Sequence, residues 1–293
     1  MTRSPVVPRR RLGFELRSLR EATGKTIEEA AAALECSSAK ISRLETGKGV
    51  PKNRDVRDLL QLYGVDDDDL AGRLFALATD GQSQGWWEDY KDLTPEPGTE
   101  YVGRYIALEQ EANSILGYEG DLIHGLLQTA EYAEALLVAL APDVSAEQRG
   151  RMVELRMKRQ VILRERVGMP PLHLRVVIGE PAILRPVGSL KIMQRQLQAI
   201  RELVDERPDN LDLQVMPLAA GPHAGLGSPF SIVHFEDTKD QDVVYLEGSQ
   251  GGTFLERQPD VDRYTRLLEA LRGQALSREE SSAAVDKQIA ALG

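Results

Sequence analysis

The sequence predicts an all-α head followed by an α+β domain whose sheet is mixed but mainly antiparallel. In residues 1–80, apolar side chains recur at helical spacing in several short segments. From residue 172 onward, short runs alternate between apolar and polar side chains, as half-buried strands do. We therefore expect a head at residues 1–80, a junction at residues 81–100 and a second domain at residues 101–293.

Two short helices follow each other closely in the head. Thr26 and Glu29 have the spacing of a capping box, in which each side chain accepts a hydrogen bond from the other residue's backbone N–H. The alanine-rich helix that follows, to Leu34, is thin, so a neighbouring helix can approach it closely. We expect Glu35 and Cys36 to form the turn after it.

The next helix begins after its N-cap Ser37 and ends at Gly47, which favours a left-handed C-cap. Ile41 and Leu44 lie three residues apart, so they share one face, which we expect to be buried. An apolar inner face combined with a small, polar and cationic outer face is typical of a DNA recognition helix. The outer face consists of Ser38, Ala39, Ser42 and Arg43.

Apolar stripes on both sides of this helix pair complete a small helical domain. Their members are Leu12, Leu16 and Leu19 before the pair, and Val56, Leu59, Leu60 and Tyr63 after it. We expect five short helices, the last of which ends near residue 80.

The charge of the head distinguishes it from an ordinary helical core. Up to Gly64 the chain has 13 lysines and arginines against 8 acidic residues, whereas the remainder has 23 against 38, which gives the net charge of −10. A basic segment within an acidic chain is the electrostatic pattern of a DNA-binding head. Arg9, Arg10 and Arg11 stand ahead of the first predicted helix, within reach of a phosphate or a minor groove. A solvated chain terminus explains these three arginines equally well.

The end of the recognition helix reads Ile41-Ser42-Arg43-Leu44-Glu45-Thr46-Gly47 and is soon followed by Pro51. This run resembles the end of the recognition helix in the Xre or lambda-repressor type of helix-turn-helix. The resemblance implies sequence-specific binding of double-stranded DNA. Ile27 departs from it, because relatives often carry a glutamine at that place as a phosphate contact.

Helix geometry divides the candidate DNA-binding residues into two groups. Ser38, Ala39 and Arg43 are assigned to base edges, because the N-terminal part of a recognition helix enters the major groove. Arg43 is the strongest of them, since a guanidinium bonds guanine through two donors and thereby contributes about 1–3 kcal/mol of discrimination. Ser37 and Glu45 are assigned structural roles. The residues assigned to phosphates are Thr26, Lys40, Ser42, Thr46 and Lys48.

Several classes of protein are excluded by composition. No apolar run approaches the roughly 20 residues of a membrane span, and the first residues lack the apolar core of a signal peptide. Cys36 is the only cysteine, which rules out an internal disulfide and a cysteine-rich zinc site. We expect a cytoplasmic, nucleoid-associated protein that needs no cofactor or metal.

The two tryptophans of the chain, Trp86 and Trp87, are adjacent in the expected junction. Adjacent tryptophans bury a large area, so we expect a wedge between domains or subunits rather than a nucleobase-stacking site. A homodimer is expected because two half-sites one helical turn apart multiply the affinity for DNA. Both tryptophans and the helix after Tyr101 are the candidates for its interface.

The second domain opens with helices and continues with strands. The expected helices are residues 101–116, a helix capped by Thr129 that runs to Leu140, and a long charged helix from the capping box of Ser145 and Gln148 to near Gly168. A strand at residues 172–178, a helix at 190–204 and a strand at 211–215 follow. The last elements are strands at 230–235, 243–246 and 253–255 and helices at 261–271 and 277–292. The connections between these last strands contain Asp237, Asp240, Gly248, Gly251 and Gly252, which favour antiparallel hairpins.

Several phrases of this domain resemble the domain of unknown function that follows an Xre head in many actinomycete regulators. They are Gly85-Trp86-Trp87, Gly125-Leu126-Leu127-Gln128-Thr129, Arg185-Pro186-Val187-Gly188, Val215-Met216-Pro217, His223-Ala224-Gly225-Leu226 and Val243-Val244-Tyr245-Leu246-Glu247. The resemblance implies an antitoxin-like transcriptional regulator, modulated by a small partner protein encoded nearby.

An enzyme and a ligand sensor are the competing interpretations of the second domain. Its four histidines are dispersed, and no P-loop, nucleophile-elbow or dinucleotide-binding motif occurs, so we expect no enzyme. The glycine-rich loop at residues 221–229 could bring backbone amides to an anion, with His223 as a pH-dependent group, although a connector is the preferred interpretation. Glu180 and Arg185 are expected to pair. A regulator whose second domain binds a small molecule stays open as the alternative.

Overall fold

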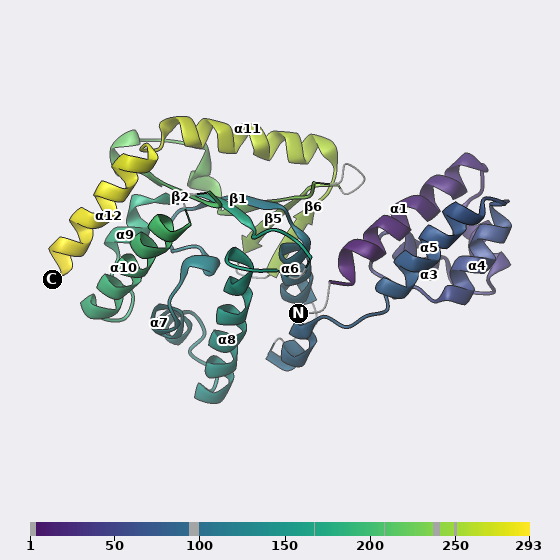
Figure 1. Cartoon of the computed structure of the whole chain (residues 1–293), viewed down its shortest axis with the longest axis horizontal. Coiled ribbons are helices and arrows are strands. Elements are labelled where there is room, and N and C mark those ends of the chain that lie inside the picture. Colours follow the sequence, from purple (N-terminus) through teal and green to yellow (C-terminus); the bar gives the residue numbers. More distant parts are fainter. Residues whose placement is uncertain (1–3, 94–99, 167, 208, 237–240, 249–250) are drawn as a thin grey trace. The chain divides into compact units, whose positions relative to one another are not determined.

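The computed structural model describes residues 4–93, 100–166, 168–207, 209–236, 241–248 and 251–293 (Figure 1). These residues form two compact units, one up to Glu88 (unit 1) and one from Asp89 on (unit 2). The division falls within the 3-10 helix η1 (Trp86–Leu93). Residues 94–99 of the expected junction, and the expected turn residues Asp237 and Asp240, lie outside the described residues.

Unit 1 is helical, and its five α-helices confirm the expected number and the expected end near residue 80. They are α1 (Val6–Ala22), α2 (Ile27–Ala33), α3 (Ser38–Glu45), α4 (Asn53–Leu62) and α5 (Asp68–Asp80). The predicted apolar stripes pack together as one core, which includes Leu12, Leu16, Ile41, Val56, Leu59, Leu60, Tyr63 and Leu74.

The start of α1 corrects one expectation. Arg9, Arg10 and Arg11 do not precede the first helix, because α1 begins at Val6 and includes them. Pro8 is compatible with this early start, since the first turn of a helix lacks acceptors for its backbone N–H groups. The Nε of Arg9 donates to the carbonyl oxygen of Gly81 at 2.6 Å, and burial lowers the pKa of this side chain. The arginine run is therefore part of a folded helix rather than a solvated terminus.

Unit 2 is built on a six-stranded sheet with the strand order β3-β2-β1-β4-β5-β6. The strands are β1 (Ser114–Glu119), β2 (His173–Gly179), β3 (Leu211–Met216), β4 (Phe230–His234), β5 (Val243–Gly248) and β6 (Gly251–Leu255). Strands β1, β2 and β3 are parallel to one another. The pairs β1–β4, β4–β5 and β5–β6 are antiparallel. The mixed, mainly antiparallel sheet and its hairpins are confirmed.

Strand β1 contradicts the helix expected at residues 101–116. The helix α6 (Glu100–Glu111) ends early, and the chain continues as the central strand of the sheet. Ile115 and Tyr118 are both buried although they face opposite sides, so β1 lacks the apolar–polar alternation of a half-covered strand. A short apolar run of this kind fits a helical pattern as well as a strand, which explains the error.

The other helices of unit 2 cover both faces of the sheet, with α11 on one side and α7, α8 and α10 on the other (Figure 1). Their bounds are α7 (Ala130–Leu140), α8 (Ala146–Arg159), α9 (Glu180–Leu184), α10 (Leu190–Glu206), α11 (Gln258–Gln274) and α12 (Arg278–Leu292). The predicted caps of α7, α8 and α12 are confirmed by hydrogen bonds to Thr129, Ser145 and Ser277. Among the described residues, no helix combines the length and the apolar character needed to cross a membrane.

Two further details of unit 2 differ from expectation. Helix α8 ends at Arg159 rather than near Gly168, because the chain tightens into the 3-10 turn η3 (Gln160–Leu163), which takes Ile162 and Leu163 into the core. Glu180 and Arg185 do not pair with each other. Arg185 instead donates to Asp121 at 2.8 Å, and Glu180 accepts from the backbone N–H of Leu218 at 2.7 Å.

The glycine-rich loop before β4 folds onto the core. Its 3-10 turn η5 (Ala224–Gly227) is capped by His223, whose Nδ1 accepts from the N–H of Gly225 at 3.2 Å. A Cβ on Gly225 would lie 2.5 Å from the Tyr118 ring, so only glycine permits this approach. These contacts support the interpretation of the loop as a connector.

Candidate nucleic-acid interface

The capping box at the start of α2 is formed as predicted. The Thr26 hydroxyl accepts from the Glu29 N–H at 3.1 Å, and the Glu29 carboxylate accepts from the Thr26 N–H at 2.8 Å. The bond from the Thr26 backbone lowers the pKa of Glu29. After α2 the chain turns at Glu35, which has a left-handed φ of 49°, and at the half-buried Cys36. The Thr26 side chain also bonds the Glu29 carboxylate, which lowers the pKa of Glu29 further.

Helix α3 has the caps and the two faces that its sequence predicts. The Ser37 hydroxyl accepts from the Lys40 N–H at 3.3 Å, and Gly47 follows the helix with a φ of 67°. Ile41 and Leu44 are buried in the core of unit 1. The opposite face of α3 is therefore the surface that unit 1 can offer to a duplex.

Helix α3 is fixed against α1 by two contacts that the sequence did not reveal. Gly13 of α1 touches the end of α3 so closely that a Cβ on it would lie 2.5 Å from the carbonyl oxygen of Leu44. Arg20 of α1 donates to both carboxylate oxygens of Glu45, at 2.6 and 2.9 Å, and this bonding raises the pKa of Arg20. Both members of the ion pair are buried. The structural role assigned to Glu45 is thereby confirmed.

The three residues assigned to base edges lie on the outer side of α3. Ala39 and Arg43 are exposed, and Ser38 is half-buried. Among the described residues, no hydrogen bond or ion pair engages the Arg43 side chain. Its five donors are thus uncommitted within the described part of the chain.

The residues assigned to phosphates differ in how far the protein already uses them. Lys48 is exposed, and no side-chain partner occurs within the described part of the chain. Lys40, in contrast, places its Nζ 2.6 Å from the Oδ2 of the buried Asp55 of α4. The Thr46 hydroxyl donates to the carbonyl oxygen of Ser42 at 2.8 Å, which occupies its only proton. Lys48 is consequently the best placed donor of this group.

The tryptophan pair belongs to unit 1. The rings of Trp86 and Trp87 meet edge to face, with centroids 6.0 Å apart, and Trp87 is buried. Gly85 allows this arrangement, because a Cβ at that position would lie 2.2 Å from the Trp87 ring.

Comparison with known families accounts for both parts of the chain. Residues 11–72 match a family described as a helix-turn-helix domain, and residues 102–287 match the domain of unknown function DUF5753. The chain belongs to the DUF5753 family. Neither the curated proteins nor the solved structures that were compared with the chain gave a match. The helix-turn-helix match indicates DNA as the ligand of unit 1.

The DUF5753 domain, which is unit 2, holds its Gly125–Leu127 turn and the residues after it through a network of side-chain amides. Gln160 donates to the carbonyl oxygens of Gly125 and Gln128, at 3.2 and 2.6 Å. Gln196 accepts from the Thr129 N–H at 2.7 Å, and its amide donates to Leu127 at the same distance. Each of these backbone N–H and C=O groups is hydrogen-bonded to a glutamine side chain from another helix. Residues 125–129 therefore have a structural role.

Charged groups lie inside the DUF5753 domain on the α8 side of the sheet. Arg159 of α8 donates to both carboxylate oxygens of Glu109, at 2.9 and 2.8 Å, and Glu109 is fully buried. Burial lowers the pKa of His124 to about 3 and, together with Glu247, raises the pKa of Glu119 to about 8. Both shifts favour the uncharged form of the side chain at neutral pH.

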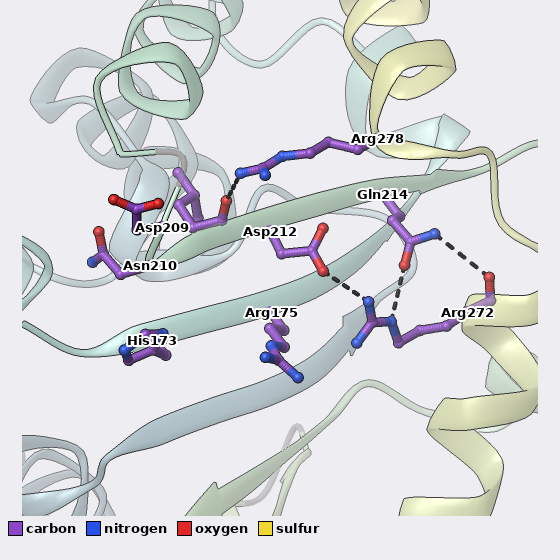
Figure 2. Close-up of a pocket in the computed structure, with 9 residues that line it drawn as sticks. His173, Arg175, Asp209, Asn210, Asp212, Gln214, Arg272 and Arg278 are labelled. Carbon is purple, nitrogen blue, oxygen red and sulfur yellow. Dashed lines mark hydrogen bonds and ion pairs between the residues drawn. The ribbon is translucent and has the colours of Figure 1, made fainter.

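A polar hollow of about 400 Å³ opens on the other face of the sheet, at the amino ends of β2 and β3 (Figure 2). Its lining comes from both strands and from α11 and α12. The residues are His173, Arg175, Asp209, Asn210, Leu211, Asp212, Gln214, Arg272 and Arg278. No sequence motif indicated this site, because its members come from three regions that are far apart along the chain, residues 173–175, 209–214 and 272–278.

Proposed function

We propose that this protein is an Xre-type transcriptional regulator that recognises a specific double-stranded DNA sequence through α3. The observation that carries the proposal is the exposed, uncommitted guanidinium of Arg43 on the outer face of a helix whose inner face is buried. A guanidinium in this position donates two parallel hydrogen bonds to O6 and N7 of a guanine in the major groove. Ser38 and Ala39 contact neighbouring base edges.

The phosphate contacts follow from the same geometry. Thr26 is exposed at the N-terminus of α2, where its hydroxyl can contact a phosphate. Lys48 contributes a mobile positive charge after α3. Lys40 is paired with Asp55, and the Thr46 hydroxyl donates to Ser42. Either side chain reaches a phosphate only if its contact within the protein opens.

The test is to select binding sequences from a random duplex library with the full chain and then to measure the affinity of variants for the selected site. Arg43→Ala should weaken specific binding by about 1–3 kcal/mol and relax the sequence preference. Arg73→Ala is a matched control, because Arg73 is an exposed arginine of unit 1 that belongs to α5 and not to α3. Equal losses on selected and random duplexes for Arg43→Ala would contradict the base contact.

Lys48→Ala provides the complementary measurement. A phosphate contact gives affinity without sequence preference, so this variant should bind all duplexes less tightly. The slope of log affinity against log salt concentration should fall by about 1. An unchanged slope would remove Lys48 from the interface.

The proposal includes a homodimer and an antitoxin-like role with a small partner protein encoded nearby. A dimer doubles the number of helices available for a palindromic operator. Sedimentation of the free protein and of its DNA complex measures the stoichiometry, and a monomer in both states contradicts the dimer. Co-expression with the neighbouring small protein, followed by DNA-binding assays, tests the partner.

A further inference from the structure

The hollow in Figure 2 exists because one face of the sheet changes from apolar to polar along β2 and β3. Val177 and Met216, near the carboxyl ends of these strands, pack under α11 in an apolar cluster. Toward the amino ends, the paired residues Arg175 and Asp212 occupy the same face. His173 and Arg175 are exposed there, so this end of the face is open to solvent.

Two of the three arginines around the hollow are held in place by the protein. The Nε of Arg272 donates to Gln214 Oε1 at 3.0 Å, and its Nη2 donates to Asp212 Oδ2 at 2.7 Å (Figure 2). The Nη1 of Arg272 is not used in these two bonds. Arg278 is anchored from the start of α12 through a bond to the carbonyl oxygen of Leu211. Such fixed guanidinium groups bind an anion at little cost in side-chain entropy.

The third arginine has no such anchor. Within the described ranges of the chain, Arg175 forms no hydrogen bond or ion pair, although it stands on a rigid strand between His173 and Arg272. The lining has three arginines against two aspartates, and Asp212 is already paired with Arg272. The hollow is therefore locally cationic in the part of the chain that carries the excess of acidic residues.

We propose that this hollow is a binding site for a small organic anion of metabolite size that carries a phosphate or carboxylate group. Arg175 donates to the anion, while Arg272 and Arg278 complete a cationic wall. The volume of about 400 Å³ is in the range of small-molecule sites and suits a compact ligand. Asp209 and Asn210 also line the hollow, and their side-chain oxygens can accept from hydroxyl groups of the ligand, whereas the amide nitrogen of Asn210 already donates to Leu163 and Leu172. The site is independent of the DNA interface proposed for unit 1.

Isothermal titration calorimetry on the full chain tests the site with four probes: pyrophosphate, citrate, adenosine monophosphate and uncharged adenosine. At least one of the anions should bind, and adenosine should not. Arg175→Ala should raise the Kd of that anion about tenfold or more, since a charge-assisted hydrogen bond is lost. Arg266→Ala is the matched control, because Arg266 is exposed on α11 and does not line the hollow.

Two further measurements distinguish binding in the hollow from a loss of folding and from binding to unit 1. Arg175→Glu should abolish binding while leaving the melting temperature unchanged, because the side chain is exposed and unpaired in the described structure. The titration is repeated with Arg43→Ala, and an unchanged Kd excludes the anion's binding to the DNA surface of unit 1. The proposal is overturned if no anion binds, if adenosine binds as well as its monophosphate, or if Arg175→Ala leaves the Kd unchanged.

Discussion

Helices α3 and α8 both carry cationic side chains, but they use them in different ways. Arg43 on α3 and Lys48 just after this helix are exposed, and neither side chain has a hydrogen-bond or ion-pair partner among the residues that the structure describes. On α8, five cationic side chains are each bonded within unit 2. The pairs are Arg149 with Glu134, Arg151 with Asp92, Arg156 with Gln128, Lys158 with Glu154, and Arg159 with Glu109.

The difference shows that the number of cationic residues does not identify a nucleic-acid surface. A guanidinium that is itself largely buried and donates to a buried carboxylate, as Arg159 does, is not presented to a phosphate at the surface. What distinguishes α3 is that Arg43 lies at its surface with no side-chain partner among the described residues. Lys40 is the intermediate case, because it belongs to α3 but contacts the buried Asp55.

The largest loss of stability is expected at the buried ion pair between Arg159 of α8 and Glu109. Glu109→Ala leaves the Arg159 guanidinium largely buried without its carboxylate, which should lower the free energy of unfolding of unit 2 by about 3–5 kcal/mol. Denaturant unfolding measures this loss. The affinity of the protein for its selected duplex should not change where both units stay folded. A loss of DNA affinity without a loss of stability would place α8 in the DNA interface.

Glu119, on the α8 side of the sheet, should make the stability of unit 2 depend on pH. Its folded pKa of about 8 exceeds its ordinary value of 4.5, so the folded state binds more protons than the unfolded state between these values. The stability of unit 2 therefore falls as the pH rises through this window. Glu119→Gln removes this cost and should raise the free energy of unfolding by about 1–3 kcal/mol at pH 8, with little gain near pH 4.5.

Unfolding curves of the two proteins at several pH values check the Glu119 prediction. His124 contributes the opposite slope below its ordinary pKa of 6.5, because its folded pKa is about 3. The difference between wild type and Glu119→Gln cancels that contribution. A difference that does not depend on pH would show that Glu119 is already ionised in the fold.

Lys40→Ala tests the intermediate case. Asp55 is buried and would lose its nearest cation, so the stability of unit 1 should fall by about 1–2 kcal/mol. Thermal unfolding measures this change, and Lys48→Ala is the matched control that should leave stability unaltered. If Asp55→Asn removes the cost of Lys40→Ala, the pair itself is the cause.

The smallest effect is expected at the exposed end of α8. Arg151 bonds Asp92 at the surface, where solvent screens the charges and side-chain ordering offsets the attraction. Arg151→Ala should therefore leave the free energy of unfolding almost unchanged. A larger loss would mean that the packing of Arg151 over the Tyr90 ring contributes more than its charge.

The sequence predicted those features of unit 1 that depend on neighbours along the chain. The caps at Thr26 and Ser37, the buried pair Ile41 and Leu44 and the left-handed Gly47 all follow from local rules. The attachment of α3 to α1 does not, because Gly13 and Arg20 meet the end of α3 only in the folded unit. The ion pair between Lys40 and Asp55 could not be predicted either, because these two residues also become neighbours only in the folded unit.

In unit 2 the half-buried strands and the hairpins were predictable, whereas the central strand was not. Strand β2 alternates at His173 and Arg175, but β1 is covered on both faces and gave no such pattern. The hollow was beyond sequence reasoning, since Arg175 and Arg272 become neighbours through the pairing of β2 with β3 and the packing of α11. Nothing in the spacing of these residues along the chain indicates that they converge.

The central position of β1 has a consequence for the order in which the protein folds. Ser114 pairs with His173 on one side and with His234 on the other, so β1 completes neither ladder until much of the later chain has been synthesised. The helices of unit 1 depend on short-range contacts, which form quickly. We expect refolding to show a fast helical phase and a slow phase in which the sheet closes. During translation the nascent chain would then expose a finished head while the remainder still lacks its core.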